Sequence, residues 1–428
     1  MKKLYPILLK QHVGAVNEPI VSVGDKVEKG SLIAKPTGLG ANIYSSFNGV
    51  VKEVNEKSII IEADEEQNDT YKPLSGKGSL LDIIQEAGIV GMGGAGFPTH
   101  IKLNVDLKGG VVIANGVECE PLLGHNIKEL TETPEIVYQG LKYAMEITNA
   151  SRGILAVKSK NTEAIRAFSK VIKDENISIF ELPDMYPMGE ERAIIREVLG
   201  KLLEPTQLPS AADAVVINVE TLTRVTEAID LKKPVISKDI TVVGKLNGGV
   251  HSRIFKDVPI GTTVGELIER AGGIDGEYGE IVLGGPFTGS STTVDTPITK
   301  TTGGIIVTMP FTEDKRKIGL LVCACSANEN RMREMADKMG SDVVLVQKCK
   351  QAVEVKGSLK CENPGNCPGQ AEKVLNFKKA GAEIILMGNC SDCSNTVMCS
   401  APKLKLGVYH VTDNVMRTVG HPLVRKLK

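Results

Sequence analysis

The chain of 428 residues is long enough for several domains, and its hydrophobic content of 42% is ordinary for a soluble globular protein. Its 51 basic and 52 acidic residues give a net charge of −1, which argues against a nucleic-acid-binding protein and against a protein held by charge on an anionic membrane. No apolar run approaches the length needed to span a bilayer, and the start is too quickly polar for a signal peptide, so we expect a cytoplasmic protein with no integral membrane segment.

The first 65 residues predict short β-strands separated by glycine turns. Residues 19–30 read Pro-Ile-Val-Ser-Val-Gly-Asp-Lys-Val-Glu-Lys-Gly, and apolar runs over 48–54 and 58–62 follow. This pattern resembles the flattened β-barrel of biotinyl and lipoyl carriers, the barrel-sandwich hybrid. A carrier needs a lysine at the hairpin tip, but the tip here spans 38–42 and the nearest lysine is Lys35. We therefore interpret residues 1–65 as a structural module.

The remaining chain predicts three further modules, which makes the fold class a multidomain α/β protein. Residues 66–230 alternate between helical and strand patterns and predict a Rossmann-like parallel sheet, with helices over 80–87 and 161–172 and strands over 110–114, 154–157, 177–182 and 214–218. Residues 231–312 are rich in strand patterns around one helix over 263–272, which predicts a β-grasp (SLBB-like) module. Residues 313–428 predict a last, cysteine-rich α/β module.

A glycine-dense loop over 91–99, Gly-Met-Gly-Gly-Ala-Gly-Phe-Pro-Thr, is the most specific run in the chain. It satisfies G-x-G-x-x-G, but a predicted helix precedes it where a dinucleotide turn needs a strand. Its backbone N–H groups can still approach a phosphate or a flat ring, and Lys102 can add a positive charge. The alternative is a flexible surface loop, which the rigid Phe-Pro-Thr sequence disfavours.

Three more segments lie where a parallel sheet would present them to a ligand. Residues 115–121 follow one strand, residues 185–191 open a helix, and residues 218–221 end another strand. Taken singly, these segments are typical of helix caps and turns.

Together with the glycine loop, these segments resemble the flavin site of the NADH dehydrogenase flavoprotein subunit and of the C subunit of the Rnf electron-transport complex. The matching motifs are Gly-Phe-Pro-Thr-x-x-Lys, Glu-x-Glu-Pro, Gly-Glu-Glu and Asn-Val-Glu-Thr, and the resemblance to the Rnf subunit spans roughly residues 1–312. It implies FMN as cofactor and NADH as hydride donor. Met92 stands where the respiratory relatives have an arginine, and Val105 where they have an aromatic residue.

The resemblance also implies which residues bind the cofactors. Phe97 and Glu120 would face the nicotinamide nucleotide. The residues implied to bind FMN are Gly91, Gly93, Gly94, Lys102, Asn115, Glu118, Tyr186, Gly189, Glu190, Glu191, Asn218 and Thr221.

Eight of the nine cysteines lie after residue 320, and the exception is Cys119. Apolar strands over 318–322, 343–348 and 384–387 each run toward cysteine, and helical patterns over 328–338 and 370–379 separate them. Parallel strands present their carboxyl ends at one sheet edge, so we expect the thiols to gather there. In a reducing compartment this clustering indicates metal, iron–sulfur or catalytic thiol chemistry rather than structural disulfides.

Two kinds of chemistry remain open for these thiols. Cys390 and Cys393 form a Cys-x-x-Cys pair at a predicted helix start, where a thiolate is stabilised, so they could act as a catalytic dithiol. Alternatively, the other thiols could hold an iron–sulfur cluster or zinc, with ligands drawn from Cys323, Cys325, Cys349, Cys361, Cys367 and Cys399.

The cysteine layout resembles the proline reductase-associated electron-transfer protein, whose family includes selenoproteins, with Cys393 at the position of the selenocysteine. This resemblance implies an NADH-dependent flavoprotein that delivers electrons to an amino-acid reductase, with D-proline reductase as the partner. The first alternative is a peripheral Rnf-type subunit, although the chain lacks the ferredoxin-like run Cys-x2-Cys-x2-Cys-x3-Cys-Pro. The second is a non-catalytic scaffold that has lost flavin. A homo-oligomer is left open.

Overall fold

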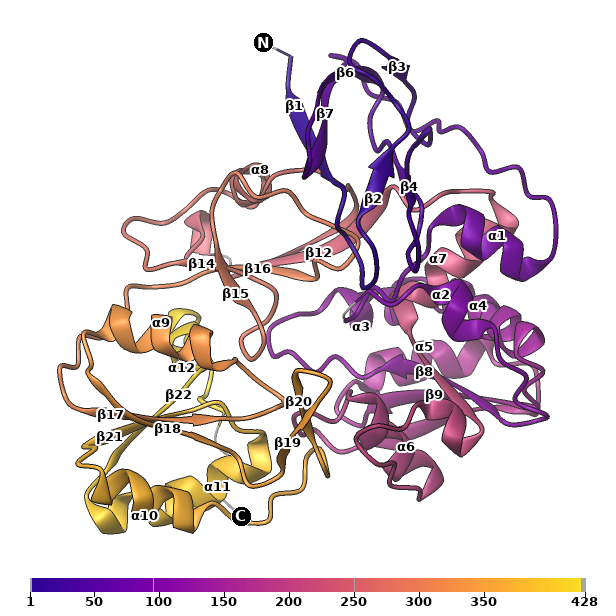
Figure 1. The fold of residues 1–428 in the computed structure, drawn as a ribbon. Coiled ribbons are helices and arrows are strands. Elements are labelled where there is room, and N and C mark those ends of the chain that lie inside the picture. Colours follow the sequence, from indigo (N-terminus) through magenta and orange to yellow (C-terminus); the bar gives the residue numbers. More distant parts are fainter. Residues whose placement is uncertain (1, 95, 250, 425–428) are drawn as a thin grey trace.

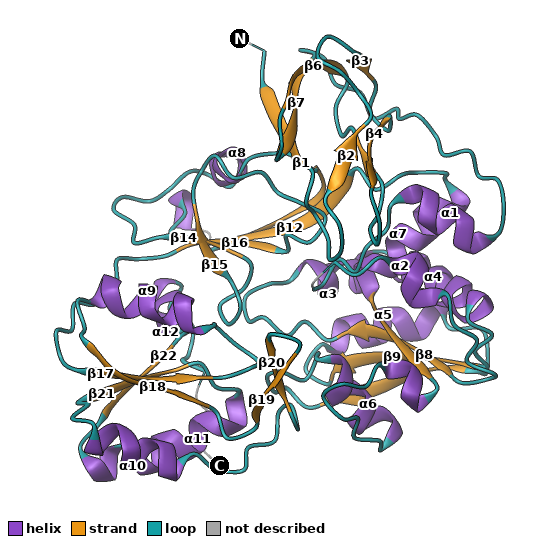
Figure 2. Cartoon of the chain, viewed as in Figure 1, coloured by secondary structure: helices purple, strands orange, loops and turns teal. Residues whose placement is uncertain are grey.

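The computed structural model describes residues 2–94, 96–249 and 251–424, except for the side chains of 392–394. Each β-sheet lies within one of the four predicted modules, while the module boundaries themselves stay a prediction. The barrel stands at one end, and each of the other three modules borders the other two (Figures 1 and 2). Within these described ranges, no helix is both long and apolar enough to cross a membrane.

The amino-terminal module is the expected β-barrel of two small sheets. β7 lies between β1 and β6, antiparallel to both, and a β2-β4-β5 sheet faces them. Alternate residues of β7 point inward, so Ile59 and Ile61 pack in the core with Ile7 and Ile33. The strands are β1 (Leu4–Leu8), β2 (Asn17–Pro19), β3 (Lys26–Val27), β4 (Leu32–Pro36), β5 (Ile43–Tyr44), β6 (Gly49–Val54) and β7 (Ser58–Ala63).

The second module is a parallel sheet in the order β10-β9-β8-β11, with helices on both faces. Strands β8, β9 and β11 are buried on both sides, which explains their continuous apolar sequences, whereas the edge strand β10 is partly exposed. Before the sheet come α1 (Leu80–Ala87) and α2 (Thr99–Leu103). The sheet region contains β8 (Val111–Gly116), α3 (His125–Glu132), α4 (Pro134–Ile147), β9 (Arg152–Lys158), α5 (Thr162–Val171), β10 (Ile177–Leu182), α6 (Glu191–Leu199), a 3-10 turn (Pro209–Ala212), β11 (Ala214–Asn218) and α7 (Val219–Asp230).

The third module is a mixed five-stranded sheet in the order β13-β12-β16-β14-β15, covered by one helix. β12 pairs antiparallel with β13 and parallel with β16, as a β-grasp arrangement requires. The elements are β12 (Ser237–Gly244), a 3-10 turn (Asn247–Gly249), β13 (Ser252–Pro259), α8 (Val264–Arg270), β14 (Ile281–Leu283), β15 (Ser290–Thr292) and β16 (Gly304–Val307).

The carboxyl-terminal module is a parallel sheet in the order β18-β17-β21-β22. The expected parallel pairing of the three cysteine-leading strands is therefore confirmed. The hairpin of β19 and β20 was not predicted, and it stands beside the second module (Figure 1). The elements are β17 (Ile318–Val322), α9 (Glu329–Met339), β18 (Val343–Lys348), β19 (Ala352–Val355), β20 (Ser358–Cys361), α10 (Ala371–Lys379), β21 (Ile384–Met387), α11 (Ser391–Ser400), a 3-10 turn (Pro402–Leu404), β22 (Gly407–His410) and α12 (Asp413–Thr418).

Candidate functional site

The glycine loop between α1 and α2 is held closed by its own backbone. Gly91 N–H donates to the carbonyl of Phe97 at 2.9 Å, and Thr99 N–H donates to the carbonyl of Ile89 at 3.0 Å. A Cβ added to Gly94 would meet nothing within 4 Å, so this part of the loop borders open space. The interpretation as a rigid loop is supported by these contacts, and its backbone is free to approach a ligand.

The loop rests on the start of α7. Met92 N–H donates to Thr221 Oγ1 at 3.0 Å, and a Cβ on Gly93 would lie 2.5 Å from Asn218 Nδ2. Asn218 caps α7 by accepting from the backbone N–H of Glu220 at 2.9 Å. Glycine is therefore required at 93 by the close approach of the cap residue.

Parallel pairing brings the two strand-end asparagines together. Asn115 at the end of β8 and Asn218 at the end of β11 are register partners. Asn115 Nδ2 also donates to the carbonyl of Gly189 at 3.0 Å, which ties the segment before α6 to the same sheet edge. The topology thus gathers all three segments that the sequence analysis selected, as expected for the carboxyl ends of parallel strands.

The start of α6 brings two carboxylates next to the ammonium of Lys102 in α2. Glu190 caps the helix by accepting from Arg192 N–H at 2.9 Å and Ala193 N–H at 3.0 Å. The ammonium of Lys102 pairs with the carboxylate of Glu191. Lys102 therefore lies at the helix N-terminus, where an anionic group would find both a cation and the helix dipole.

Two buried carboxyl groups in the turn after β8 have raised pKa values. Burial raises the pKa of Glu118 to about 7, although Asn126 Nδ2 donates to this carboxyl group at 2.8 Å. Burial also raises the pKa of Glu120. The Glu120 carboxylate accepts from the backbone N–H groups of Phe287 at 2.8 Å and Thr288 at 2.9 Å. Its predicted contact with a nicotinamide nucleotide would therefore need an exchange of partners with this β-grasp loop.

Two predicted aromatic contacts have different surroundings. Phe97 is 39% exposed at the edge of the glycine loop and is accessible to a ligand. Tyr186 is buried instead, and its ring stacks on Phe287 with a centroid distance of 3.5 Å and an interplanar angle of 5°. Its hydroxyl donates to the carbonyl of Cys325. Tyr186 thus links the predicted flavin segment to the cysteine-rich module.

The cysteines gather at one sheet edge, as predicted. Contacts between sulfur atoms link Cys361 to Cys325, Cys325 to Cys323 and Cys323 to Cys349, which forms a row that we call the sulfur row. Cys390 packs in the same buried cluster, beside Tyr186 and Phe287.

The remaining predicted thiols differ in position. Gln370 Nε2 lies 3.1 Å from Cys349 Sγ and 3.8 Å from Cys367 Sγ, which places Cys367 next to the row. Cys399 is exposed. It lies near the other end of α11 from Cys390, about 13 Å away at the helical rise of 1.5 Å per residue. The side chain of Cys393 lies outside the described residues, so the Cys390–Cys393 dithiol stays a prediction.

The surroundings of the sulfur row shift the pKa values of its thiols in different directions. The hydrogen bond from the Cys325 thiol lowers the pKa of Cys361, and the Asn363 backbone and the Arg192 charge act in the same direction. Hydrogen bonding to Cys323 and Cys361 and burial together raise the pKa of Cys325. Among the described side chains, no three Cys, His, Asp or Glu groups are arranged to hold a metal ion. The iron–sulfur or zinc assignment stays a prediction.

The segment over 186–192 also docks the cysteine-rich module onto the second module. Tyr186 N–H donates to Ser391 Oγ at 3.0 Å, and Ser391 N–H donates back to the carbonyl of Tyr186 at 3.2 Å. Arg192 donates to the carbonyl of Cys361, and Arg196 Nη1 donates to the carbonyl of Pro364 at 2.7 Å. Arg192 and Ser391 were not predicted as site residues, because nothing in the local sequence marks a contact between modules.

Asn389 is a further residue that the sequence analysis did not select. It is fully buried directly before Cys390, and within the described chain neither atom of its side-chain amide has a hydrogen-bond partner. An unpaired buried amide is costly, typically by about 1–3 kcal/mol. A residue of this kind beside gathered sulfur atoms is typical of a functional site.

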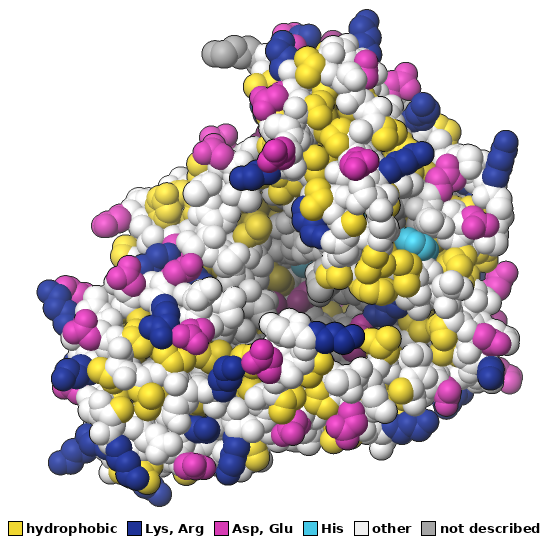
Figure 3. Space-filling model, in the orientation of Figure 1, with side chains coloured by type: hydrophobic (Ala, Val, Ile, Leu, Met, Phe, Trp, Pro, Cys, Tyr) yellow, Lys and Arg dark blue, Asp and Glu magenta, His cyan; other side chains and the backbone are white. Residues whose placement is uncertain are grey.

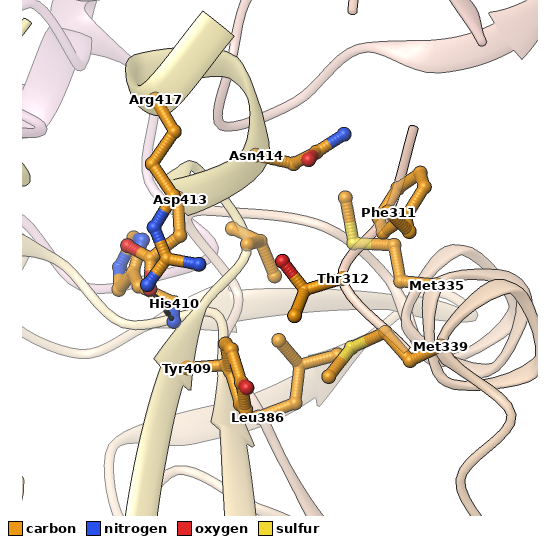
Figure 4. Close-up of a pocket in the computed structure, with 11 residues that line it drawn as sticks. Phe311, Thr312, Met335, Met339, Leu386, Tyr409, His410, Asp413, Asn414 and Arg417 are labelled. Carbon is orange, nitrogen blue, oxygen red and sulfur yellow. Dashed lines mark hydrogen bonds between the residues drawn. The ribbon is translucent and has the colours of Figure 1, made fainter. Parts of the chain in front are cut away.

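A second hollow lies within the cysteine-rich module (Figure 4). Met335 and Met339 of α9 lie across it from Tyr409 and Arg417, and its lining is mostly apolar. It contains none of the predicted cofactor residues, and it touches the cysteine site through His410, whose ring meets Phe287 edge-on at 5.3 Å. The face in Figure 3 is hollowed instead at its centre, between the modules.

The residues of this central site fit FMN. The open backbone at Gly94 offers room for a close approach, Lys102 offers a cation for a phosphate, and the starts of α6 and α7 lie at the same sheet edge. These observations support FMN binding independently of any relative.

Comparison with known protein families matches residues 84–227 to the Nuo51 FMN-binding domain and residues 1–68 to the RnfC barrel sandwich hybrid domain. The barrel, the flavoprotein-like second module and FMN as cofactor, all predicted from the sequence, are thereby confirmed.

Several characterised proteins are similar to the chain over much of its length. It is 35% identical to the C subunit of the proton-translocating ferredoxin:NAD(+) oxidoreductase complex of Clostridium ljungdahlii, over 70% of this chain and 69% of that protein. It is 32% identical to the C subunit of the Na(+)-translocating ferredoxin:NAD(+) oxidoreductase complex of Acetobacterium woodii, over 73% and 74%. Cobalamin reductase PduS of Citrobacter freundii is 37% identical, over 54% of this chain and 49% of that protein.

Proposed function

Because this chain belongs to the family of the C subunits of Rnf-type ferredoxin:NAD(+) oxidoreductase complexes, we propose that it exchanges electrons between a nicotinamide nucleotide, FMN and its carboxyl-terminal cysteines. FMN, when bound, takes up the hydride of a reduced nicotinamide, and NADH is the donor that we propose. The protein contributes the binding and orientation of the two rings and the surroundings that tune them.

Each part of the central site has a role in this proposal. Lys102 and the start of α6 would hold the phosphate of FMN, and the backbone of the glycine loop would approach its ring. Asn115 and Asn218 would orient the ring from the ends of β8 and β11. Glu118, with its pKa near 7, would present a neutral or a charged carboxyl group according to pH.

The observation that carries the proposal is the contact between the flavin segment and the sulfur row. Tyr186 and Arg192 flank Gly189, Glu190 and Glu191, and both bind backbone carbonyls of cysteines in the row. The predicted flavin segment and the sulfur row are therefore neighbours in the fold, which supports an electron relay between them.

The acceptor that we propose is a partner subunit of an Rnf-type assembly. The cysteine layout predicts an amino-acid reductase as acceptor and an Rnf-type complex as the alternative, and the relatives favour the Rnf-type complex. Their names describe complexes of several subunits, so we expect this chain to act on a protein partner rather than on a small acceptor.

A spectroscopic experiment tests the proposal. The protein is purified without oxygen, mixed with FMN, freed of excess cofactor and titrated with NADH. We expect a retained flavin spectrum that bleaches with NADH. A colourless protein would support the scaffold alternative, and a retained flavin that does not bleach would exclude NADH as donor.

Affinity capture from membranes of the source organism then tests the partner: recovery of further Rnf-type subunits supports it, and recovery of an amino-acid reductase contradicts it.

A further inference from the structure

We propose that the β-grasp loop over 284–289 occupies the ribose site of the nicotinamide nucleotide and leaves this site when the nucleotide binds. The loop reads Gly-Gly-Pro-Phe-Thr-Gly and connects β14 to β15. The inference rests on the proposed function, in which Glu120 faces the nucleotide. It adds a conformational step that precedes hydride transfer.

The loop donates to both oxygen atoms of the Glu120 carboxylate. Oε2 accepts from the backbone N–H of Phe287 at 2.8 Å, while Oε1 accepts from the backbone N–H of Thr288 at 2.9 Å and from its hydroxyl at 2.5 Å. In dinucleotide-binding α/β folds, an acidic side chain typically accepts from a ribose hydroxyl. The loop therefore uses the acceptor atoms that a ribose would use, and Thr288 presents a hydroxyl of the same kind.

The loop backbone also fills the space against this carboxylate. A Cβ added at Gly285 would lie 2.3 Å from Glu120 Cδ and 2.4 Å from Glu120 Oε2. The approach is as close as a glycine permits, so no room is left for a ribose on this face of Glu120 while the loop is closed.

The ring of Phe287 covers a second predicted ligand contact. It is 1% exposed and lies parallel to the ring of Tyr186, which the resemblance places among the flavin contacts. Release of the loop would uncover this face of Tyr186. One loop thus covers a predicted nucleotide contact and a predicted flavin contact at the same time.

The loop has the form of a unit that can move as one piece. Gly289 N–H donates to the carbonyl of Gly285 at 2.9 Å, which closes the loop on itself. Gly284 leads into it with a φ of +109°, a backbone conformation that favours glycine. Thr288 is exposed, so a nucleotide can reach the Glu120 contact from solvent.

The closed loop is also attached to the cysteine-rich module. The carbonyl of Phe287 accepts from Ser326 Oγ at 3.2 Å, and its ring meets His410 edge-on. The same ring packs with Cys323 and Cys390. These contacts hold the loop closed, and the apparent nucleotide affinity is therefore the intrinsic affinity reduced by the fraction of molecules whose loop is open.

The first test measures hydrogen–deuterium exchange of the FMN-loaded protein, with and without NAD+ as a probe that binds but donates no hydride. The amides of Phe287 and Thr288 are bonded to Glu120 in the closed loop, so the segment over 284–289 should exchange about tenfold faster or more with saturating NAD+. The strand over 237–244, inside the same sheet, is the reference. Unchanged or slower exchange over 284–289, with NAD+ shown by calorimetry to be bound, would overturn the inference and leave the proposed function intact.

The second test opens the loop by two different substitutions. Thr288→Val removes the hydroxyl donor, and Gly285→Ala places a Cβ against the Glu120 side chain. Each should lower the dissociation constant of NAD+ by about tenfold, because a hydrogen bond to a charged group no longer favours the closed loop or because the closed loop is crowded. Thr293→Val, the same change at an exposed threonine of this module, should bind NAD+ as the unaltered protein does. Unchanged or weaker binding in both Thr288→Val and Gly285→Ala would overturn the inference.

The direction of the expected change separates the inference from misfolding and from failure of the proposed function. A misfolded variant binds NAD+ more weakly, whereas an open loop binds it more tightly. If NAD+ binds to none of these FMN-loaded proteins, the proposed function fails, and the loop has no nucleotide to admit. If NAD+ binds to all of them equally, the proposed function stands and the role of the loop is wrong.

Discussion

The hydroxyl of Tyr186 donates a hydrogen bond to the backbone carbonyl of Cys325, while its ring stacks on Phe287 at 3.5 Å between centroids. One side chain therefore joins three modules: Tyr186 precedes α6, Phe287 lies in the β-grasp loop, and Cys325 follows β17. The position of the cysteine-rich module against the predicted flavin segment depends in part on this contact, alongside the docking by Ser391 and Arg192.

Replacing Tyr186 tests that dependence. Tyr186→Phe removes one hydrogen bond and keeps the stack, so the free energy of unfolding should fall by about 1 kcal/mol. Tyr186→Ala also removes the stack and should cost about 3–5 kcal/mol. Urea denaturation measures both changes, and stopped-flow spectroscopy measures electron transfer from flavin to the thiols. Tyr278→Phe, at a tyrosine that is 43% exposed, is the control. Equal effects of Tyr186→Phe and Tyr278→Phe would show that the hydroxyl has no linking role.

Lys102→Ala should weaken FMN binding by about 10–100-fold, because a charge-assisted hydrogen bond to the phosphate is worth about 1.5–3 kcal/mol. The loss also leaves the Glu191 carboxylate without the partner seen here, next to an anionic cofactor. Removing that charge in Lys102→Ala/Glu191→Gln should restore part of the affinity, which a double-mutant cycle would measure. Flavin fluorescence gives the dissociation constants, and Lys170→Ala on the exposed side of α5 is the control. Unchanged affinity in Lys102→Ala would place the phosphate elsewhere.

The FMN affinity should depend on pH through Glu118. Burial raises its pKa to about 7, so its carboxyl group is neutral below this pH and charged above it. A charged Glu118 repels the anionic cofactor, and FMN binding should therefore weaken as the pH rises from about 6 to 8. Glu118→Gln stays neutral throughout and should lack this component. The ratio of the two dissociation constants isolates Glu118, since titration of the FMN phosphate affects both proteins alike. A ratio that does not change with pH would contradict the assignment.

The local sequence patterns were sufficient to predict the sheets and the segments that form the candidate site. Apolar runs such as Val111–Gly116 and Ala214–Asn218 are separated by helical patterns, and the rule for parallel strands then places Asn115 beside Asn218. The same reasoning places Cys323, Cys349 and Cys390 at one edge of the last sheet.

Contacts between modules could not be predicted in this way. The stack of Tyr186 on Phe287 joins residues 101 positions apart and has no periodic signal. The β19–β20 hairpin is too short and too polar to stand out in the sequence, and its docking on the second module through Arg192 and Cys361 is seen only in the tertiary structure.

The last prediction concerns Lys300, whose ammonium is buried where three modules meet. It donates to the carbonyl of Asn42 in the barrel and, at 2.7 Å, to the carbonyl of Gly88 before the glycine loop. Burial lowers its pKa from 10.5 to about 7. Between these two values the unfolded chain binds more protons than the folded chain, so the contribution of Lys300 to stability should rise with pH from about 7 to 10.

Lys300→Met keeps the length of the side chain but cannot titrate, so the stability difference between it and the unaltered protein isolates this group. That difference should shift in favour of the unaltered protein as the pH rises, because neutral Lys300 keeps both hydrogen bonds without the desolvation cost of its charge. Thermal denaturation followed by circular dichroism at several pH values measures it, with Lys35→Met on the barrel surface as the control. Parallel stability curves for the unaltered protein and Lys300→Met would mean that Lys300 remains charged when buried, and that the two carbonyls stabilise its ammonium form.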